Sequence, residues 1–123
     1  MSHYIANLRD IEFCLFDLLG REKVMGTDPY GEVDRDTAIG MLEEVKRLCE
    51  NDLAASFVEG DRIGTDFNKA TGDVKLPESF KKSYKAYVDG EWWRVDAPVE
   101  LGGMKIPPSV RWAIAEMVMK FQH

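Results

Sequence analysis

Apolar residues recur every three or four positions along four stretches of this chain, which is the spacing that places side chains on one face of an α-helix. The first stretch, 4–19, carries the stripe Ile5, Leu8, Ile11, Leu15 and Leu18. The stripe is widened well beyond one face by Phe13, Cys14, Phe16 and Leu19. A helix this apolar must be covered from two sides, either by its own domain or by another domain or subunit. Gly20 is expected to end it.

The second and longest stretch is predicted to begin after Asp34, whose carboxylate can accept hydrogen bonds from the free N–H groups of the first turn. Gly60 is expected to end it. Glu43 and Arg47 lie four residues apart on the polar face, where they would form an ion pair. The predicted core stripe of this helix is Ala38, Met41, Leu42, Val45, Leu48, Cys49, Leu53 and Phe57.

A polar, turn-rich segment over 61–76 follows, in which Phe67 and Val74 flank a turn and indicate a two-stranded ribbon or a folded loop. A third helix starts near Pro77, carries Phe80, Tyr84 and Tyr87/Val88 as its stripe, and is expected to close with Gly90 in the left-handed conformation. The fourth helix begins at Pro107-Pro108-Ser109. Gly102-Gly103 is interpreted as a tight turn, because a phosphate-binding glycine pair would open a helix directly.

Composition narrows the class of protein. A length of 123 residues favours one domain, and a net charge of −6 argues against nucleic acid or an anionic membrane as the main partner. The longest apolar run is far shorter than the roughly 20 residues of a membrane span. Cys14 and Cys49 fall on apolar stripes, so we expect two buried, free thiols in a cytoplasmic protein. His3 and His123 lie at opposite ends of the chain, and no cluster has the spacing of metal ligands.

Candidate catalytic groups are also missing from the pattern. Glu43 and Glu44 are consecutive and therefore do not face each other on a helix, so a solvated face explains them better than an acid–base pair. The sequence predicts an all-α fold, a bundle of about four main helices with a small polar loop or hairpin. The chain is predicted to form a single domain over 1–123, divided into a leading helix and connection (1–33) and a main part (34–123). No catalytic, cofactor-binding or metal-binding residue is predicted.

A resemblance adds to this reading. The chain runs from a helix through the Trp92-Trp93 turn and a Pro98-Val-Glu-Leu-Gly-Gly103 step to a helix containing Ala113-Ile-Ala-Glu-Met117. This order resembles the amino-terminal helical domain of acyl-CoA dehydrogenases, over 34–123. Residues 1–10 resemble an extra leading helix of a bacterial subgroup of larger members, whereas Lys120 to His123 depart from the family pattern.

The resemblance implies a flavoprotein with a helical, a β and a second helical domain, which passes a hydride from an acyl-CoA thioester to FAD. The catalytic glutamate and the main flavin motifs of the family lie in the two later domains. This chain alone is therefore expected to bind no FAD and to be inactive, with acyl-CoA as a partner only in the full-length enzyme. Gly102, Gly103 and Met117 are the candidates for lining the substrate pocket, and a homo-oligomer is expected.

A second hypothesis belongs to a different class of function. The chain could be a stand-alone, non-catalytic helical module for interaction or assembly, either a natural truncation or an engineered domain. Both hypotheses predict apolar helix faces that a partner covers.

Overall fold

The computed structural model describes residues 5–120. The elements, in chain order, are α1 (Leu8–Glu12), a π-helical segment (Phe13–Leu18), a 3₁₀ turn (Arg21–Lys23), α2 (Arg35–Leu48), a second π-helical segment (Cys49–Leu53), α3 (Ala54–Ile63), β1 (Asp66–Phe67), β2 (Val74–Lys75), α4 (Glu78–Asp89), 3₁₀ turns over Trp92–Val95 and Val99–Leu101, and α5 (Pro108–Lys120). The predicted all-α class, with one small hairpin, is confirmed.

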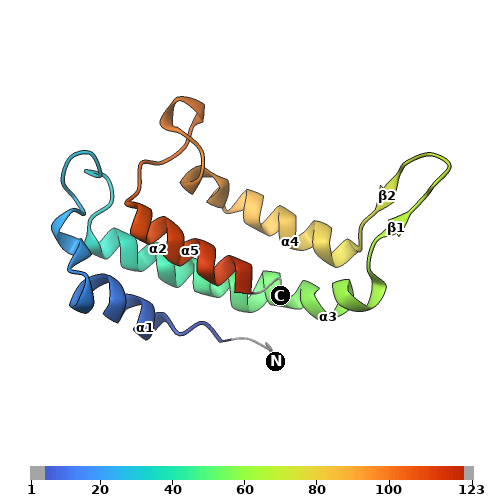
Figure 1. Cartoon of the computed structure of the whole chain (residues 1–123), viewed down its shortest axis with the longest axis horizontal. Coiled ribbons are helices and arrows are strands. Elements are labelled where there is room, and N and C mark those ends of the chain that lie inside the picture. Colours follow the sequence, from blue (N-terminus) through green and yellow to red (C-terminus); the bar gives the residue numbers. More distant parts are fainter. Residues whose placement is uncertain (1–4, 121–123) are drawn as a thin grey trace.

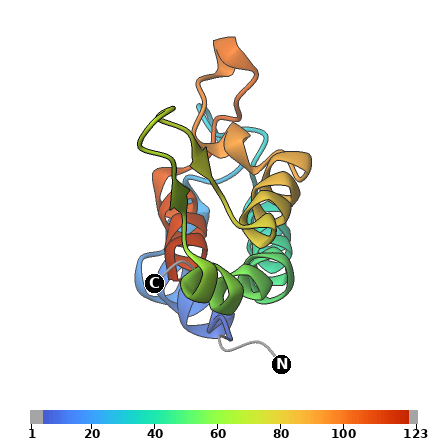
Figure 2. The same cartoon turned by 90° about the vertical axis from the view of Figure 1, so that its right-hand side faces the viewer.

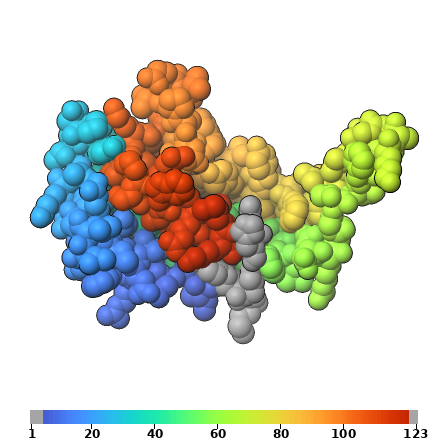
Figure 3. All heavy atoms as spheres, viewed as in Figure 1, coloured from blue at the N-terminus to red at the C-terminus, as the bar shows by residue number. Residues whose placement is uncertain are grey.

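The long element from α2 through the second π segment to α3 supports the other helices (Figure 1). α5 packs on α2, and α4 packs on α3 and on the second π-helical segment. Seen end-on, α4 and α5 stand on either side of the molecule with α3 below them (Figure 2). The β1–β2 hairpin projects from one end of the helical body (Figure 3).

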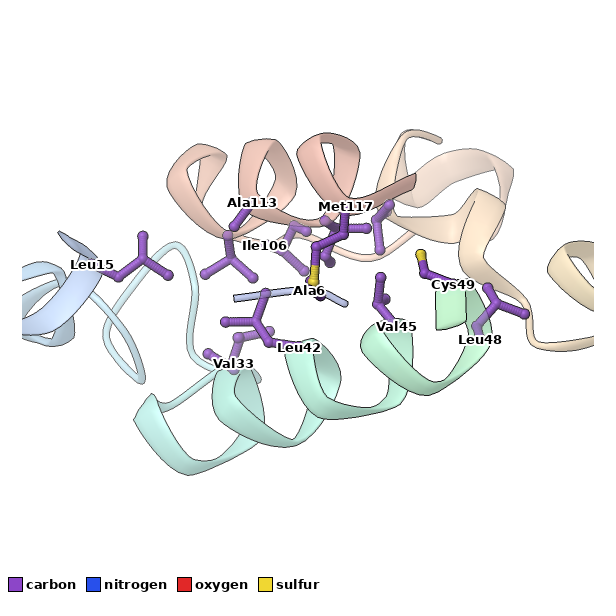
Figure 4. Close-up of a cluster of buried hydrophobic side chains, with 14 of the residues drawn as sticks. Ala6, Leu15, Val33, Leu42, Val45, Leu48, Cys49, Ile106, Ala113 and Met117 are labelled. Carbon is purple, nitrogen blue, oxygen red and sulfur yellow. The ribbon is translucent and has the colours of Figure 1, made fainter. Parts of the chain in front are cut away.

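The core lies between α2 and α5 (Figure 4), and the first helical segment lies below these helices in the view of Figure 1. Leu42, Val45 and Met117 are fully buried there. The glutamate of the second π segment ties the start of the chain to this core, because the backbone N–H of Ala6 donates to Glu50 Oε1 at 2.9 Å. Six of the eight predicted core positions of the second stretch are buried, and Met41 and Phe57 are half-buried.

The first helical segment is covered on one side only. Its predicted start at Tyr4 lies outside the described residues, and the helix begins at Leu8 after an N-cap by the Asn7 side chain. From Phe13 onward it is π-helical, so residues five apart are one turn apart, which places Phe13 and Leu18 on one exposed face. Leu15 and Phe16 form the buried face. Nothing in the described part of the chain covers the outer side.

Cys14 corrects a prediction. The expected burial of this thiol is wrong, because the π-helical turn carries the side chain to the outside, while Cys49 is buried as predicted. Both thiols are free. Gly20 ends the segment as expected, in the left-handed region at φ 56°.

The amino-terminal cap of α2 is confirmed. The Asp34 carboxylate accepts a hydrogen bond from the backbone N–H of Thr37 at 2.7 Å, and this bond lowers the pKa of Asp34. The predicted partner of Arg47 is wrong, because its guanidinium pairs with Glu44, three residues away, and not with Glu43.

The prediction that Gly60 ends the long helix is wrong. The helix continues to Ile63, and Gly64, at φ 65°, terminates it. Gly60 is needed inside the helix for a different reason. A Cβ there would lie 2.0 Å from Cε1 of Phe80, so the missing side chain makes room for that ring.

The hairpin prediction is confirmed, with Phe67 paired to Val74 in an antiparallel register. At the end of α4 the left-handed residue is Glu91, at φ 58°, and not Gly90, which stays helical at φ −75°. The indole of Trp92 explains the glycine, since a Cβ on Gly90 would lie 2.8 Å from that ring. Trp92 packs against the core while Trp93 is exposed.

Candidate functional site

A cavity of about 680 Å³ lies between the second π segment with α3, helix α4, and the last turns of α5. The walls are mainly aromatic and aliphatic. The lining residues are Leu53, Ser56, Phe57, Gly60, Asp61, Leu76, Phe80, Ser83, Tyr84, Tyr87 and Val118. Three helices thus border a half-open hollow that the side chains of residues 5–120 leave unfilled.

The cavity exists because α4 packs through its small residues. Ser79 and Ser83 are the buried positions of this helix, whereas Tyr84 remains 72% exposed. Ser83 Oγ donates a hydrogen bond of 3.0 Å to the backbone carbonyl of Asp52, in the second π segment. This contact holds the serine face of α4 against the long helix and turns the aromatic stripe toward the cavity.

Gly60 and Phe80 bring α3 and α4 together along one wall. The Phe80 ring occupies the space that a side chain on residue 60 would fill. Phe80 is nevertheless 37% exposed, because its other face borders the cavity. The width of the hollow therefore depends on a residue without a side chain.

The electrostatics of the walls favour an uncharged occupant. Among the lining residues, all within the described part of the chain, Asp61 is the one charged side chain, and no lysine or arginine is present. Partial burial raises the pKa of the Tyr87 hydroxyl, and the nearby Asp96 carboxylate adds to this shift, so Tyr87 stays neutral at pH 7. A diphosphate needs cations or free N–H groups, so this cavity does not fit the phosphates of FAD or of coenzyme A.

Gly102 and Gly103 form a closed turn between α4 and α5. Gly102 is left-handed at φ 86°, its carbonyl accepts a 2.9 Å hydrogen bond from Arg94 Nε, and the N–H of Gly103 donates to the Pro98 carbonyl at 3.0 Å. A Cβ on Gly103 would lie 1.7 Å from the Ala97 carbonyl oxygen. These glycines serve a tight chain reversal, and α5 begins only at Pro108.

Met117 lies apart from both features. Its side chain points from α5 toward α2, and it is fully buried between these helices (Figure 4). Neither Met117 nor the glycine pair lines the cavity between α3 and α4. The structure does not bring the three predicted pocket residues together around that hollow, and their part in a substrate pocket stays a prediction.

Sequence reasoning missed the cavity because it assigned Phe57, Phe80 and Tyr84 to the core. One signal was available. Ser79 and Ser83 form a second stripe four residues apart, beside the aromatic one, and either face of α4 could have packed on α3. The close approach that small side chains allow selected the serine face.

Residues 5–120 show neither a metal centre nor a membrane-spanning helix. No group of three or more histidine, cysteine, aspartate or glutamate side chains is arranged to hold a metal ion there. Within the same range no helix combines the length and the apolar character that crossing a membrane requires.

The chain is similar in sequence to part of two acyl-CoA dehydrogenases. Over 119 residues, 97% of the chain, it is 48% identical to the broad-specificity linear acyl-CoA dehydrogenase FadE5 of Mycobacterium tuberculosis. Over 115 residues, 94% of the chain, it is 36% identical to the 3-methylmercaptopropionyl-CoA dehydrogenase of Ruegeria pomeroyi. The chain spans 20% and 19% of the lengths of these relatives. No protein-family model matches the chain.

Proposed function

We propose that this chain forms the amino-terminal helical part of a FAD-dependent acyl-CoA dehydrogenase, in which it supplies structure and apolar surface. The observation that carries the proposal is the match of 48% identity across 97% of the chain to a dehydrogenase of this kind. The substrate, an acyl-CoA thioester, and the flavin would be held mainly by parts of the enzyme that this chain does not span. The walls of the cavity between α3 and α4 do not fit the diphosphate of FAD, so the flavin would be held elsewhere in the enzyme.

Within such an enzyme, Gly102, Gly103 and Met117 would border the substrate pocket. The exposure of Gly102 on a rigid turn supports this role for the glycine step. Met117 is buried, so its part would be to hold α5 in place against α2. The proposal also treats 1–123 as one domain, and the single apolar cluster that joins Ala6 to Met117 supports this.

A chimera tests the proposal. The matching segment of the Mycobacterium tuberculosis dehydrogenase would be replaced by this chain, and acyl-CoA oxidation measured with an artificial electron acceptor. We expect turnover within about tenfold of the parent enzyme, since 48% identity preserves the main packing positions. A chimera that folds, carries flavin and does not turn over would contradict the proposal. A stand-alone assembly module, the alternative hypothesis, predicts that outcome.

The proposal includes self-association of the chain. Phe13, Leu18 and Leu19 on the first helical segment and Trp112 and Met119 on α5 are at least half exposed. Such surfaces are normally covered, and a two-fold dimer is the simplest closed arrangement. Light scattering at micromolar concentration should give a mass above the 14.0 kDa of the monomer. Trp112→Glu should shift the chain toward monomer and the control Lys105→Glu should not, whereas a monomeric parent would refute the idea.

We also propose a cytoplasmic location. Support comes from the two free thiols, because a reducing compartment keeps exposed cysteines such as Cys14 unpaired.

A further inference from the structure

We propose that the hollow between α3 and α4 is a docking site for a helix of the same longer protein, supplied by the polypeptide that follows residue 123. This inference rests on the proposed function, because it takes the chain to be one part of a full-length dehydrogenase. It deepens that proposal by assigning the face of this domain on which the rest of the enzyme packs.

The hollow extends beyond the contact between α3 and α4. A second, smaller hollow of about 180 Å³ lies between α5 and the turn after α4, and Tyr87 and Val118 line both hollows. α4 and α5 each pack on the long helix and stand apart on either side of the molecule (Figure 2). The two hollows therefore adjoin and form one trough along α4. We call this surface the α4 trough.

Exposed apolar side chains continue from the α4 trough onto its rim. Tyr84 is 72% exposed, Met119 is 50% exposed and Leu76 is 43% exposed, although each of them lines one of the two hollows. A small molecule inside the hollows would leave the outer parts of these side chains in water. A polypeptide that lies along the trough covers the rim as well as the floor, and contiguous apolar surface of this kind marks a contact with protein.

The polar groups of the trough favour a helix over an extended segment. The hydroxyls of Ser56 and Ser83 already donate to backbone carbonyls of the second π-helical segment, so they have no proton left for an incoming backbone. At the other end of the trough, Arg111 Nε donates to Asp96 Oδ1 at 2.6 Å. An extended segment would bury N–H and C=O groups without partners here, whereas a helix pairs these groups internally.

The spacing of the wall residues also fits a helix. Phe80, Tyr84 and Tyr87 recur at four and three residues on α4, and such rows form the ridges between which the side chains of a neighbouring helix pack. On the long helix the lining runs from Leu53 to Asp61, about 12 Å at a rise of ~1.5 Å per residue. A helix of about eight residues or more, with apolar side chains three and four apart, spans this length.

Position and length indicate which polypeptide supplies the helix. α5 ends at Lys120, and Val118 in its last turn lines both hollows, so the polypeptide that leaves α5 starts beside the trough. The chain covers 20% and 19% of the lengths of the two dehydrogenases that it matches, so most of such an enzyme lies outside it. A segment joined to the same chain has a far higher effective concentration at the trough than a second copy of the chain has in solution.

Thiol labelling of the dehydrogenase chimera, compared with the isolated chain, tests the inference. Tyr84→Cys places a thiol on the rim of the trough, and Cys14→Ser removes the exposed native thiol. Labelling at residue 84, followed by peptide mass spectrometry, should be at least tenfold slower in the chimera. Lys82→Cys is the matched control, because residue 82 is exposed on α4 outside both linings and should label at the same rate in the two proteins.

A photoreactive benzophenone attached at residue 84 identifies the covering segment. We expect cross-links within one molecule, to a stretch that follows the segment replaced by this chain. A proline in the middle of that stretch should restore fast labelling, since proline breaks a helix. If the chimera does not fold by circular dichroism, overlapping peptides from the rest of the Mycobacterium tuberculosis dehydrogenase are added to the isolated chain. One of them should slow labelling at residue 84 and not at residue 82.

The inference is overturned by equal labelling rates at residue 84 in the chimera and the isolated chain, by cross-links to a second copy, or by peptides none of which slows labelling. Turnover is a separate readout. An active chimera in which residue 84 labels fast refutes this inference alone. An inactive chimera in which residue 84 is protected refutes the proposed function alone.

Discussion

Replacement of Gly103 by alanine tests the tight turn that precedes α5. The added Cβ would lie 1.7 Å from the carbonyl oxygen of Ala97, 2.4 Å from its carbonyl carbon and 2.8 Å from the carbonyl oxygen of Pro98. An ordinary C···O contact is about 3.3–3.6 Å, so the 97–98 backbone must move by roughly 1.5 Å. Backbone cannot swing aside as the end of a flexible side chain can.

The expected loss can be worked from the hydrogen bonds of the turn. Gly103 N–H and Leu101 N–H both donate to the Pro98 carbonyl at 3.0 Å, and Met104 N–H donates to the Arg94 carbonyl at 2.8 Å. Moving the Pro98 carbonyl weakens two or three bonds that contribute about 1 kcal/mol each. We therefore expect Gly103→Ala to lower the free energy of unfolding by about 2–3 kcal/mol.

Urea unfolding followed by circular dichroism measures this loss. With a slope of about 1.5 kcal/mol/M, the midpoint should fall by roughly 1.3–2 M. Gly40→Ala is the matched control, because a Cβ at Gly40, inside α2, meets nothing within 4 Å and removes the helical penalty of glycine. It should raise stability by up to ~1 kcal/mol. A Gly103→Ala protein as stable as the parent would refute the argument from close approach.

Two further predictions concern single side chains. Burial, with a smaller contribution from Glu50, raises the pKa of Cys49 to about 12, so at pH 8 a thiol reagent should label Cys14 quickly and Cys49 only after denaturation. Cys14→Ser should abolish the fast phase of labelling, and Cys49→Ser should keep it. Fast labelling of two thiols in native protein, or a fast phase that persists in Cys14→Ser, would contradict this prediction. The folded-state pKa of Asp34 lies below its usual 3.8, so its contribution to stability is present above that value and is lost as the pH falls through the folded-state pKa. Asp34→Asn should flatten the acid dependence of the urea midpoint, and an unchanged slope below pH 4 would rule out the cap as its source.

Helices that carry one clear apolar stripe could be predicted from the sequence. The α2 stripe, its Asp34 cap and the pairing of Phe67 with Val74 follow from local patterns that tertiary contacts reinforce. Glycine was less informative. Gly60 looked like a helix end but lies inside α3, where it makes room for the ring of Phe80 from α4. Gly90 does cap α4, but in a right-handed conformation and close to the ring of Trp92. A glycine in a sequence does not show whether the backbone conformation or a neighbouring side chain requires the absence of a Cβ.

The first π-helical segment accounts for the error at Cys14. A turn with i→i+5 hydrogen bonds shifts every later side chain around the helix axis relative to a 3.6-residue repeat. Cys14 was assigned to the buried stripe on the α-helical period and lies outside on the π-helical one. No residue type marks such a turn, so its position depends on how the two ends of the helix pack.

The candidate site could not be predicted because it depends on a competition between two faces of α4. Burying Phe80 and Tyr84 fully would gain about 25 cal/mol per Å² of apolar surface, a few kcal/mol over the exposed parts of the two side chains. The serine face gains close helix packing and the hydrogen bond from Ser83 to Asp52 instead. The Phe80 ring also packs over Gly60 of α3, so α4 meets the long helix through its serine face and through one aromatic ring. This divided packing leaves part of the aromatic stripe exposed beside the hollow, which the period of the apolar residues alone does not predict.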